Sequence, residues 1–244
     1  MDVMEQRREL LLAVNSKTGK LRYWFDGNDA PINGAWQDKI SGIRFVLYKN
    51  GSTTNADTLW NQEQGCYIFN GKDNDYALLP NMNTVNFNWG NHWRFEFDIE
   101  QNGKNSTSAF WDLGSIGNSS KALGFSLVPA AETNPRGTMS MNWKLLGNDS
   151  NPGLSLPPPE PVIISNEDEF VRYTGYYAIV DGGDGYDRLH RMLNEASDIA
   201  SVLVPKTQYG PTWANYRSYI GRGVLSNSYY SNVKIHSFKV YVID

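Results

Sequence analysis

Residues 93–100 alternate without interruption between apolar and polar side chains. Trp93, Phe95, Phe97 and Ile99 fall on one side, and Glu96, Asp98 and Glu100 fall on the other. Period-two alternation over eight residues is typical of a half-buried β-strand. The segment therefore predicts a strand with one face on a core and the other face on solvent or a cleft.

Many further short segments have a strand-like pattern and are separated by turn residues. We predict strands at residues 21–27, 43–48, 66–71, 76–80, 109–113, 122–128, 138–145, 170–180, 187–193, 199–204, 216–220 and 233–242. The segment 148–161 contains Pro157, Pro158 and Pro159 and has no periodicity, so we predict a long polyproline-like surface loop there. Many short strands with little helix indicate an all-β, two-sheet antiparallel sandwich.

The last predicted strand, residues 233–242, also alternates. Continuous alternation would place Val233, Ile235, Ser237, Lys239 and Tyr241 on one face, with Lys234, His236, Phe238, Val240 and Val242 on the other. Each face then mixes apolar and polar residues.

Residues 1–14 form an amphipathic helix candidate, which Asn15, Ser16 and Gly19 would end. Such a helix either docks on a partner or sister subunit, or packs back on its own sandwich, and the sequence leaves both open. We therefore divide the chain into residues 1–20, an anchor, and residues 21–244, the sandwich.

Composition excludes several partners. The formal net charge is -4 and no dense basic run occurs, so we expect no nucleic-acid partner. No run approaches the ~20 apolar residues that span a bilayer, so we expect no membrane insertion. No secretory signal pattern opens the chain, so we expect it to be synthesised and folded in a reducing cytosol. Cys66 is the sole cysteine and is expected to be a small core residue.

The order of several short motifs resembles a known family. Residues 24–27 (Trp-Phe-Asp-Gly), 36–42 (Trp-Gln-Asp-Lys-Ile-Ser-Gly) and 67–76 resemble the opening of laminin G-like domains of the concanavalin A-like lectin/glucanase superfamily. Residues 219–223 and 233–241 resemble that family's closing strands. The resemblance covers residues 21–244, although residues 106–161 fit it less clearly. It implies a jelly roll with one concave sheet, a fold commonly used to bind glycans or proteins.

The same superfamily contains retaining glycosidases of the lichenase and laminarinase group, whose active strand carries a Glu-x-Asp-x-Glu motif. Glu96, Asp98 and Glu100 match that motif. The resemblance would make Glu96 the nucleophile, Glu100 the general acid/base, and Asp98 the residue that holds the proton balance between them. Acidic residues are also ordinary on the solvent face of a sandwich strand, and we favour that interpretation.

Laminin G-like domains often hold calcium, and the acidic residues of one glycine-rich turn are the candidate ligands here. They are Asp181, Asp184 and Asp187. The glycines alone also explain the turn, and the spacing does not fit an EF-hand loop. We expect no other cofactor.

Aromatic side chains in polar, loop-like stretches are the candidates for glycan contact. They are Trp60, Trp89, Trp111, Tyr209, Trp213, Tyr229 and Tyr230. Sandwiches bind sugars with aromatic faces and with amides and acids at a rim. Any single one of these side chains can instead close the core. Together they exceed what a core needs, so we expect at least one exposed aromatic cluster.

These observations predict a non-enzymatic, lectin-like protein. Arg7 and Arg8 ahead of Leu10, Leu11 and Leu12 resemble the starts of many phage tail and accessory virion proteins. We therefore predict a virion-associated protein of a tailed phage, on the tail or head surface, made in the host cytoplasm without a signal peptide. It would bind glycans or other virion proteins and oligomerise or assemble through its N-terminal helix. The alternatives are a purely structural, protein-binding virion component and a β-glucanase-like hydrolase.

Overall fold

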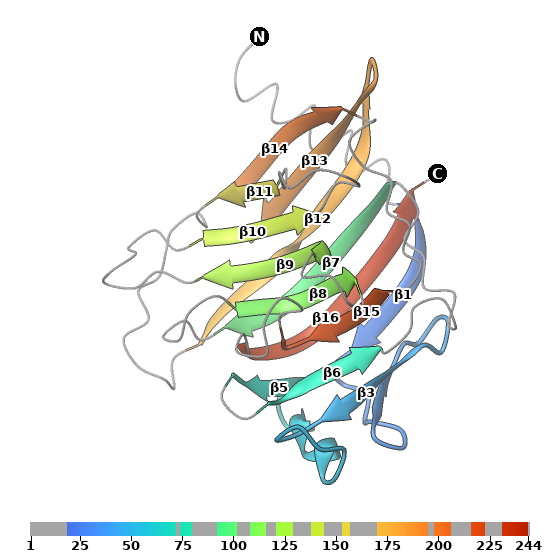
Figure 1. Ribbon diagram of the computed structural model, residues 1–244, viewed down its shortest axis with the longest axis vertical. Helices are drawn as coiled ribbons and strands as arrows, with labels where there is room; N and C mark the ends of the chain where they lie inside the picture. The colour runs from blue at the N-terminus through green and yellow to red at the C-terminus, as the bar shows by residue number, and fades with distance from the viewer. Residues whose placement is uncertain are drawn as a thin grey trace.

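Two antiparallel β-sheets make up the described part of the chain (Figure 1). The computed structural model describes residues 19–71, 74–79, 92–101, 108–115, 121–128, 138–143, 153–156, 170–194, 198–205, 216–222 and 231–243. One short 3-10 helix, Ala56–Leu59, lies within these ranges. The predicted all-β, two-sheet antiparallel sandwich is confirmed.

Sheet A contains the alternating strand. Its hydrogen-bonded order is β14 (Asp198–Pro205), β13 (Tyr186–Leu193), β12 (Val171–Gly183), β7 (His92–Gln101), β16 (Asn232–Ile243), β5 (Cys66–Asn70) and β4 (Trp60–Asn61). Strand β1 (Lys20–Asp26) pairs with the second half of β16, beyond the stretch that pairs with β5. The long strand β7 therefore lies between β12 and β16.

Sheet B faces sheet A. Its order is β11 (Gly153–Leu156), β10 (Thr138–Trp143), β9 (Lys121–Val128), β8 (Ser108–Ser115), β15 (Tyr216–Ile220), β6 (Tyr76–Leu79), β3 (Arg44–Tyr48) and β2 (Ala35–Gln37). In Figure 1 this sheet is the layer in front, with β7, β12 and β16 behind it.

Aromatic side chains from both sheets form the core. Trp36 of β2 stacks on Tyr67 of β5, with ring centroids 4.3 Å apart. Phe25 of β1 meets the rings of Trp36 and Phe45 edge-on at 5.6 and 5.1 Å. Such offset and edge-to-face pairs add to the free energy that burial of the rings contributes. Sheet A is thus fixed on sheet B near the end of β1.

The alternation of β7 is confirmed. Trp93, Phe95, Phe97 and Ile99 are all buried in the core. Glu96, Asp98 and Glu100 are half-buried on the opposite face, which we call the outer face of sheet A. Cys66 is buried as well, as predicted.

Strand β16 does not alternate without interruption, and the prediction of its two faces was wrong. Its register against β7 shifts between Ile235 and Ser237. Because a one-residue bulge exchanges the faces of everything beyond it, Phe238 and Val240 join Val233 and Ile235 in the core. The outer face of the strand receives polar side chains instead, including Lys234 and Lys239.

Two other predicted segments need comment. The proline-rich segment 148–161 contains strand β11 at the edge of sheet B, where the sequence predicted only a loop. The predicted N-terminal helix lies outside the described residues. None of the described helical residues forms a segment with the length and hydropathy that crossing a bilayer requires.

Several motif residues that carry the family resemblance have structural roles in turns. Asp38 is buried and accepts hydrogen bonds from the Trp24 amide and, at 2.6 Å, from the Ser41 hydroxyl. Asp75 is buried and accepts the Asn50 amide at 2.9 Å. Buried polar groups need such partners, which explains why acids stand at these positions.

Candidate functional site

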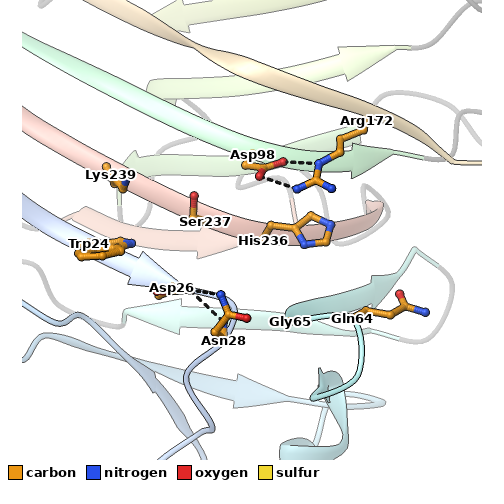
Figure 2. A pocket seen from close by; sticks show the side chains of 10 residues that line it. All are labelled: Trp24, Asp26, Asn28, Gln64, Gly65, Asp98, Arg172, His236, Ser237 and Lys239. Carbon is orange, nitrogen blue, oxygen red and sulfur yellow. Dashed lines mark hydrogen bonds and ion pairs between the residues drawn. The ribbon is translucent and has the colours of Figure 1, made fainter. Parts of the chain in front are cut away.

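The outer face of sheet A carries two adjoining hollows, which we call together the outer groove; Figure 2 shows the residues that line the first. The first, of about 370 Å³, lies between β1, β16, β7 and β12 and is lined by Trp24, Asp98, Arg172 and His236, among others. The second, of about 330 Å³, continues along β7 and β12 and is lined by residues such as Arg94, Thr174 and Tyr176. Asp98, Ser237 and Lys239 line both, so the two hollows form one surface.

The loop that follows β1 forms one wall of the outer groove and is held from beneath by core aromatics. The indole N–H of Trp36 donates to the Asp26 carbonyl at 3.0 Å, and that of Trp60 donates to the Gly27 carbonyl at 2.9 Å. The Tyr67 hydroxyl donates to the Asp29 carbonyl at 2.8 Å. These bonds fix the backbone that carries Asp26 and Asn28, so the wall is pre-formed.

Gly27 allows this wall to approach its neighbours. Its amide donates to the His236 carbonyl at 2.6 Å. A Cβ atom at this position would lie 2.5 Å from the Gly65 carbonyl oxygen and 2.7 Å from that of His236. Only glycine fits such a close backbone approach.

Every carboxylate on the outer face of β7 is paired with a cation. The Arg94 guanidinium lies 2.7 Å from Glu96, and Arg172 donates two hydrogen bonds to Asp98 at 2.9 and 2.8 Å. Glu100 lies 2.8 Å from His236 Nε2 and 3.3 Å from Lys234 Nζ. At the far side of the groove, Lys39 lies 2.7 Å from Asp26. The acidic strand is therefore electrically neutralised in place.

These partners set the pKa values of the acids. Burial would raise the pKa of Glu100, but the hydrogen bond from His236 and the positive charge of Lys234 together lower it below its usual value. Burial would likewise raise the pKa of Asp26, and hydrogen bonds from Lys39 and Asn28 lower it instead. Both groups are thus ionised at neutral pH.

Trp24 is the aromatic side chain of the outer groove. Its ring is half-buried and lies 4.5 Å from Lys39 Nζ and 5.0 Å from Lys239 Nζ, within cation–π range of both. Tyr176 lines the other hollow, with the Arg94 guanidinium 4.0 Å over its ring. Each end of the groove thus combines an aromatic ring with cations.

The predicted catalytic residues lie on the outer face, but their surroundings do not suit a retaining pair. A general acid needs a raised pKa so that it carries a proton at working pH. The pKa of Glu100 is shifted in the opposite direction, and the Glu96 carboxylate is held by Arg94 and by the Tyr241 hydroxyl at 3.4 Å.

The predicted calcium ligands lie around the β12–β13 turn. Asp187 is buried and lies 2.9 Å from His92 Nε2, while Asp181 accepts the Gly183 amide at 2.9 Å. Asp184 adopts a left-handed conformation in the turn, with φ 48°. No group of His, Cys, Asp or Glu side chains placed to hold a metal ion occurs in the described ranges, which include these three residues.

Of the predicted aromatic contacts, Trp60 packs against the core and is not among the residues that line the outer groove. Five others, Trp89, Tyr209, Trp213, Tyr229 and Tyr230, lie outside the described residues, and of Trp111 only the backbone, in β8, is described. The expected aromatic cluster has a counterpart on the outer side of sheet B, where half-buried Tyr48 and Tyr76 stack with centroids 4.7 Å apart and Tyr219 lies 5.9 Å further.

Sequence analysis missed the residues that shape the outer groove, above all Trp24, Arg172 and Lys239. The sequence offered a signal only for the two basic residues, Arg172 and Lys239. A strand with acidic side chains at alternate positions can pair with strands that carry basic side chains at alternate positions. Such pairing favours a sheet face of cross-strand ion pairs.

Comparison with known proteins defines the fold only. No family model matches the sequence, and no curated protein matches it. The binding domain of botulinum neurotoxin serotype D/C VPI 5993 superimposes with a TM-score of 0.53 and 11% identity, over 93% of this chain and 49% of that one. A botulinum neurotoxin type C structure superimposes with a TM-score of 0.52 and 11% identity, over 95% of this chain and 49% of that one. Trypanosoma rangeli sialidase superimposes with a TM-score of 0.50 and 11% identity, over 98% of this chain and 36% of that one.

This chain spans about half the length of each toxin chain and about a third of the sialidase chain. At these identities the likeness extends to the fold alone.

Proposed function

We propose that this protein binds glycans without cleaving them and that the outer groove is the binding surface. The observation that carries the proposal is a pre-formed hollow across β1, β16, β7 and β12 that combines an aromatic ring with hydroxyl, amide and charged groups. Sugar sites have this composition, since the apolar face of a sugar packs on a ring while its hydroxyls find fixed polar partners. The loop that carries Asp26 and Asn28 is fixed by core aromatics, so little ordering is needed on binding.

The state of the carboxylates supports binding over catalysis. Glu96, Asp98 and Glu100 are each paired with a cation, and the pKa of Glu100, the candidate general acid, is lowered by the hydrogen bond from His236 and the charge of Lys234. Neutralised, ion-paired carboxylates instead form a rigid polar floor that accepts hydrogen bonds from sugar hydroxyls.

One structural neighbour is consistent with this assignment. Cell entry of botulinum neurotoxin type C depends on interaction with two ganglioside molecules. That protein shares the fold over most of this chain at 11% identity, so it supports the suitability of the scaffold and says nothing about individual residues here.

The proposed biological setting is the surface of a tailed-phage particle. Its support is the sequence pattern of residues 1–14, which suits an anchor or oligomerisation element. Deleting residues 1–14 should abolish assembly while the sandwich stays folded by circular dichroism. If the truncated protein still oligomerises or enters particles, this part of the proposal is wrong.

A broad glycan panel, with each well also assayed for new reducing ends, tests the binding function. Ser237 lines both hollows, so Ser237→Phe should fill the groove and weaken binding. The matched control is Thr54→Phe, in an exposed loop that does not line the groove. The proposal is supported if the protein binds a glycan without cleaving it, and if Ser237→Phe reduces this binding while Thr54→Phe does not. Cleavage would favour the hydrolase alternative with Glu96 and Glu100. Neither binding nor cleavage of any glycan would favour a purely structural component.

A further inference from the structure

The charged groups of the outer groove differ in whether they already have a partner. Among its lining residues, the carboxylates of Asp26, Glu96 and Asp98 each lie within 3 Å of a basic side chain. Each such pair has no net charge, and a bound ligand meets it as a dipole. The paired groups therefore give the groove no overall preference for a charged ligand.

Lys239 is the exception. Its cross-strand neighbour on β7 is Glu96, whose carboxylate is held by Arg94 at 2.7 Å. Within the described part of the chain, no carboxylate lies within ion-pair distance of the Lys239 ammonium, and its one recorded contact is the Trp24 ring at 5.0 Å. Among the described residues that line the groove, Lys239 is thus a positive charge without an acid in ion-pair contact.

The position of Lys239 makes that charge central. Lys239 and Ser237 are shared by both hollows, so they stand where the two parts of the groove join. In Figure 2 both side chains rise from β16, with Trp24 on the neighbouring strand β1. A ligand that lies along the groove from Trp24 toward Tyr176 passes this point.

Other hydrogen-bond donors lie nearby. The hydroxyls of Ser237 and Thr174 line the groove and make no hydrogen bond to the described residues. Arg94 pairs with Glu96 through Nη2, while its buried Nε and Nη1 have no partner there. These nitrogens are enclosed, so they contribute positive potential and do not contact a ligand.

We infer that the outer groove selects glycans that carry an acidic sugar, whose anionic group is held by the Lys239 ammonium and the Ser237 hydroxyl. A carboxylate or a sulfate ester satisfies this chemistry, since lysine acts as a point charge toward both. Trp24 keeps the ammonium at the junction by its cation–π contact. The inference rests on the proposed function, because it names the ligand class of the same groove.

The test uses the full chain on a glycan array that contains matched pairs, each differing by one acidic group. Suitable sets are lactose, 3′-sialyllactose and 3′-sulfolactose, and a glucuronic-acid-ended oligosaccharide with its glucose-ended counterpart. Binding should be concentrated on the acidic members and should weaken as salt is raised. Comparing the acidic members of these sets shows whether a sialic acid, a uronic acid or a sulfate provides the anion.

Variants then place the anion. Lys239→Gln should weaken binding of the best acidic ligand about 10- to 100-fold, because a charge-assisted hydrogen bond is lost, and should leave the neutral counterpart unchanged. Lys239→Arg keeps the charge and should retain most of the affinity. The matched control is Lys20→Gln, which removes a charge from an exposed position at the start of β1, outside the groove.

The outcomes separate the two proposals. Equal binding of acidic and neutral partners, or loss of affinity that Lys20→Gln reproduces, would overturn this inference while glycan binding stands. Binding of no glycan would overturn the proposed function and this inference with it.

Discussion

The two faces of β7 show how one strand serves two purposes. Its inner face consists of Trp93, Phe95, Phe97 and Ile99, all buried among aromatic and aliphatic side chains from both sheets. Its outer face consists of charged side chains, each in an ion pair with a residue of its own or a neighbouring strand. The backbone is shared, so a rigid inner face gives the outer face a fixed geometry.

This contrast implies that stability and recognition can be altered separately in this protein. Buried apolar area is the main source of folding free energy, whereas half-exposed ion pairs contribute little. Changes on the inner face should therefore unfold the chain, and changes on the outer face should alter binding with little effect on folding. The following predictions test this separation, from the largest expected effect to the smallest.

Phe95→Ala should have the largest effect. The Phe95 ring is fully buried and lies 5.2 Å from the Phe238 ring and 6.0 Å from the Phe97 ring. Losing it leaves a cavity and should lower the free energy of unfolding by about 3–5 kcal/mol. Denaturant unfolding measures this, with Asp98→Asn on the outer face of the same strand as the control, because its partner Arg172 is more than half exposed. Equal losses for both variants would contradict the separation of the two faces.

The stability of the fold should also depend on pH through His190, which is buried on β13 of sheet A. Burial, and next the charge of Arg188, lower the pKa of His190 to about 4. Between about pH 6.5 and pH 4 the unfolded chain takes up a proton that the folded chain does not, so stability should fall as pH is lowered through this range. The contribution is about 3 kcal/mol at most.

The pKa of His190 is measured directly from its imidazole resonances during an NMR titration of the folded protein. Titration near pH 4 is expected. Titration near pH 6.5 would mean that water reaches this side chain, and it would remove the predicted loss of stability in acid.

Gly27→Ala should have an intermediate effect on folding and should also disturb the outer groove. The added Cβ would meet two backbone carbonyl oxygens, which cannot move as a flexible side chain would. A loss of about 1–3 kcal/mol is expected, with weaker glycan binding, because the wall that carries Asp26 and Asn28 must shift. Thermal unfolding and the glycan panel check this. Gly34→Ala is the comparison, since nothing lies within 4 Å of a Cβ there and any loss at Gly34 reports its positive φ of 71° instead of a close contact.

Asp98→Asn should have the smallest effect on folding. Its partner Arg172 is more than half exposed, so water and salt screen the pair. The free energy of unfolding should change by less than about 1 kcal/mol, while the Arg172 guanidinium becomes available to ligands. A loss of several kcal/mol in denaturant unfolding would show that this ion pair stabilises the fold, against the proposed role of the outer face.

Much of the fold could be predicted because local pattern and tertiary structure agree along most of the chain. The alternation of residues 93–100 survives in β7 because its inner residues all pack into one core of aromatic and aliphatic side chains. The same logic failed at β16, since a bulge near His236 adds a residue that no alternation pattern reveals. It also failed at β11, where pairing with β10 provides the order that a proline-rich segment lacks by itself.

The candidate site was harder to predict because it is assembled from strands that are distant in sequence. Trp24, Asp98, Arg172 and Lys239 belong to four strands, and the sequence does not give the order in which these strands pair. The predicted contacts were aromatic residues in loop-like stretches, whereas Trp24 lies within a strand and faces outward. The acidic motif was noticed, but its cations, which decide its chemistry, were not assigned to it.

Backbone NMR of the labelled protein, titrated with the best ligand of the glycan panel, shows directly whether the outer groove binds it. The outer groove predicts shift changes in the amides around Trp24, Asp98, Arg172 and Lys239, from four strands of sheet A at once. Changes confined to sheet B, for example around Tyr48 and Tyr76, would contradict the account and place the binding surface on the opposite side of the sandwich.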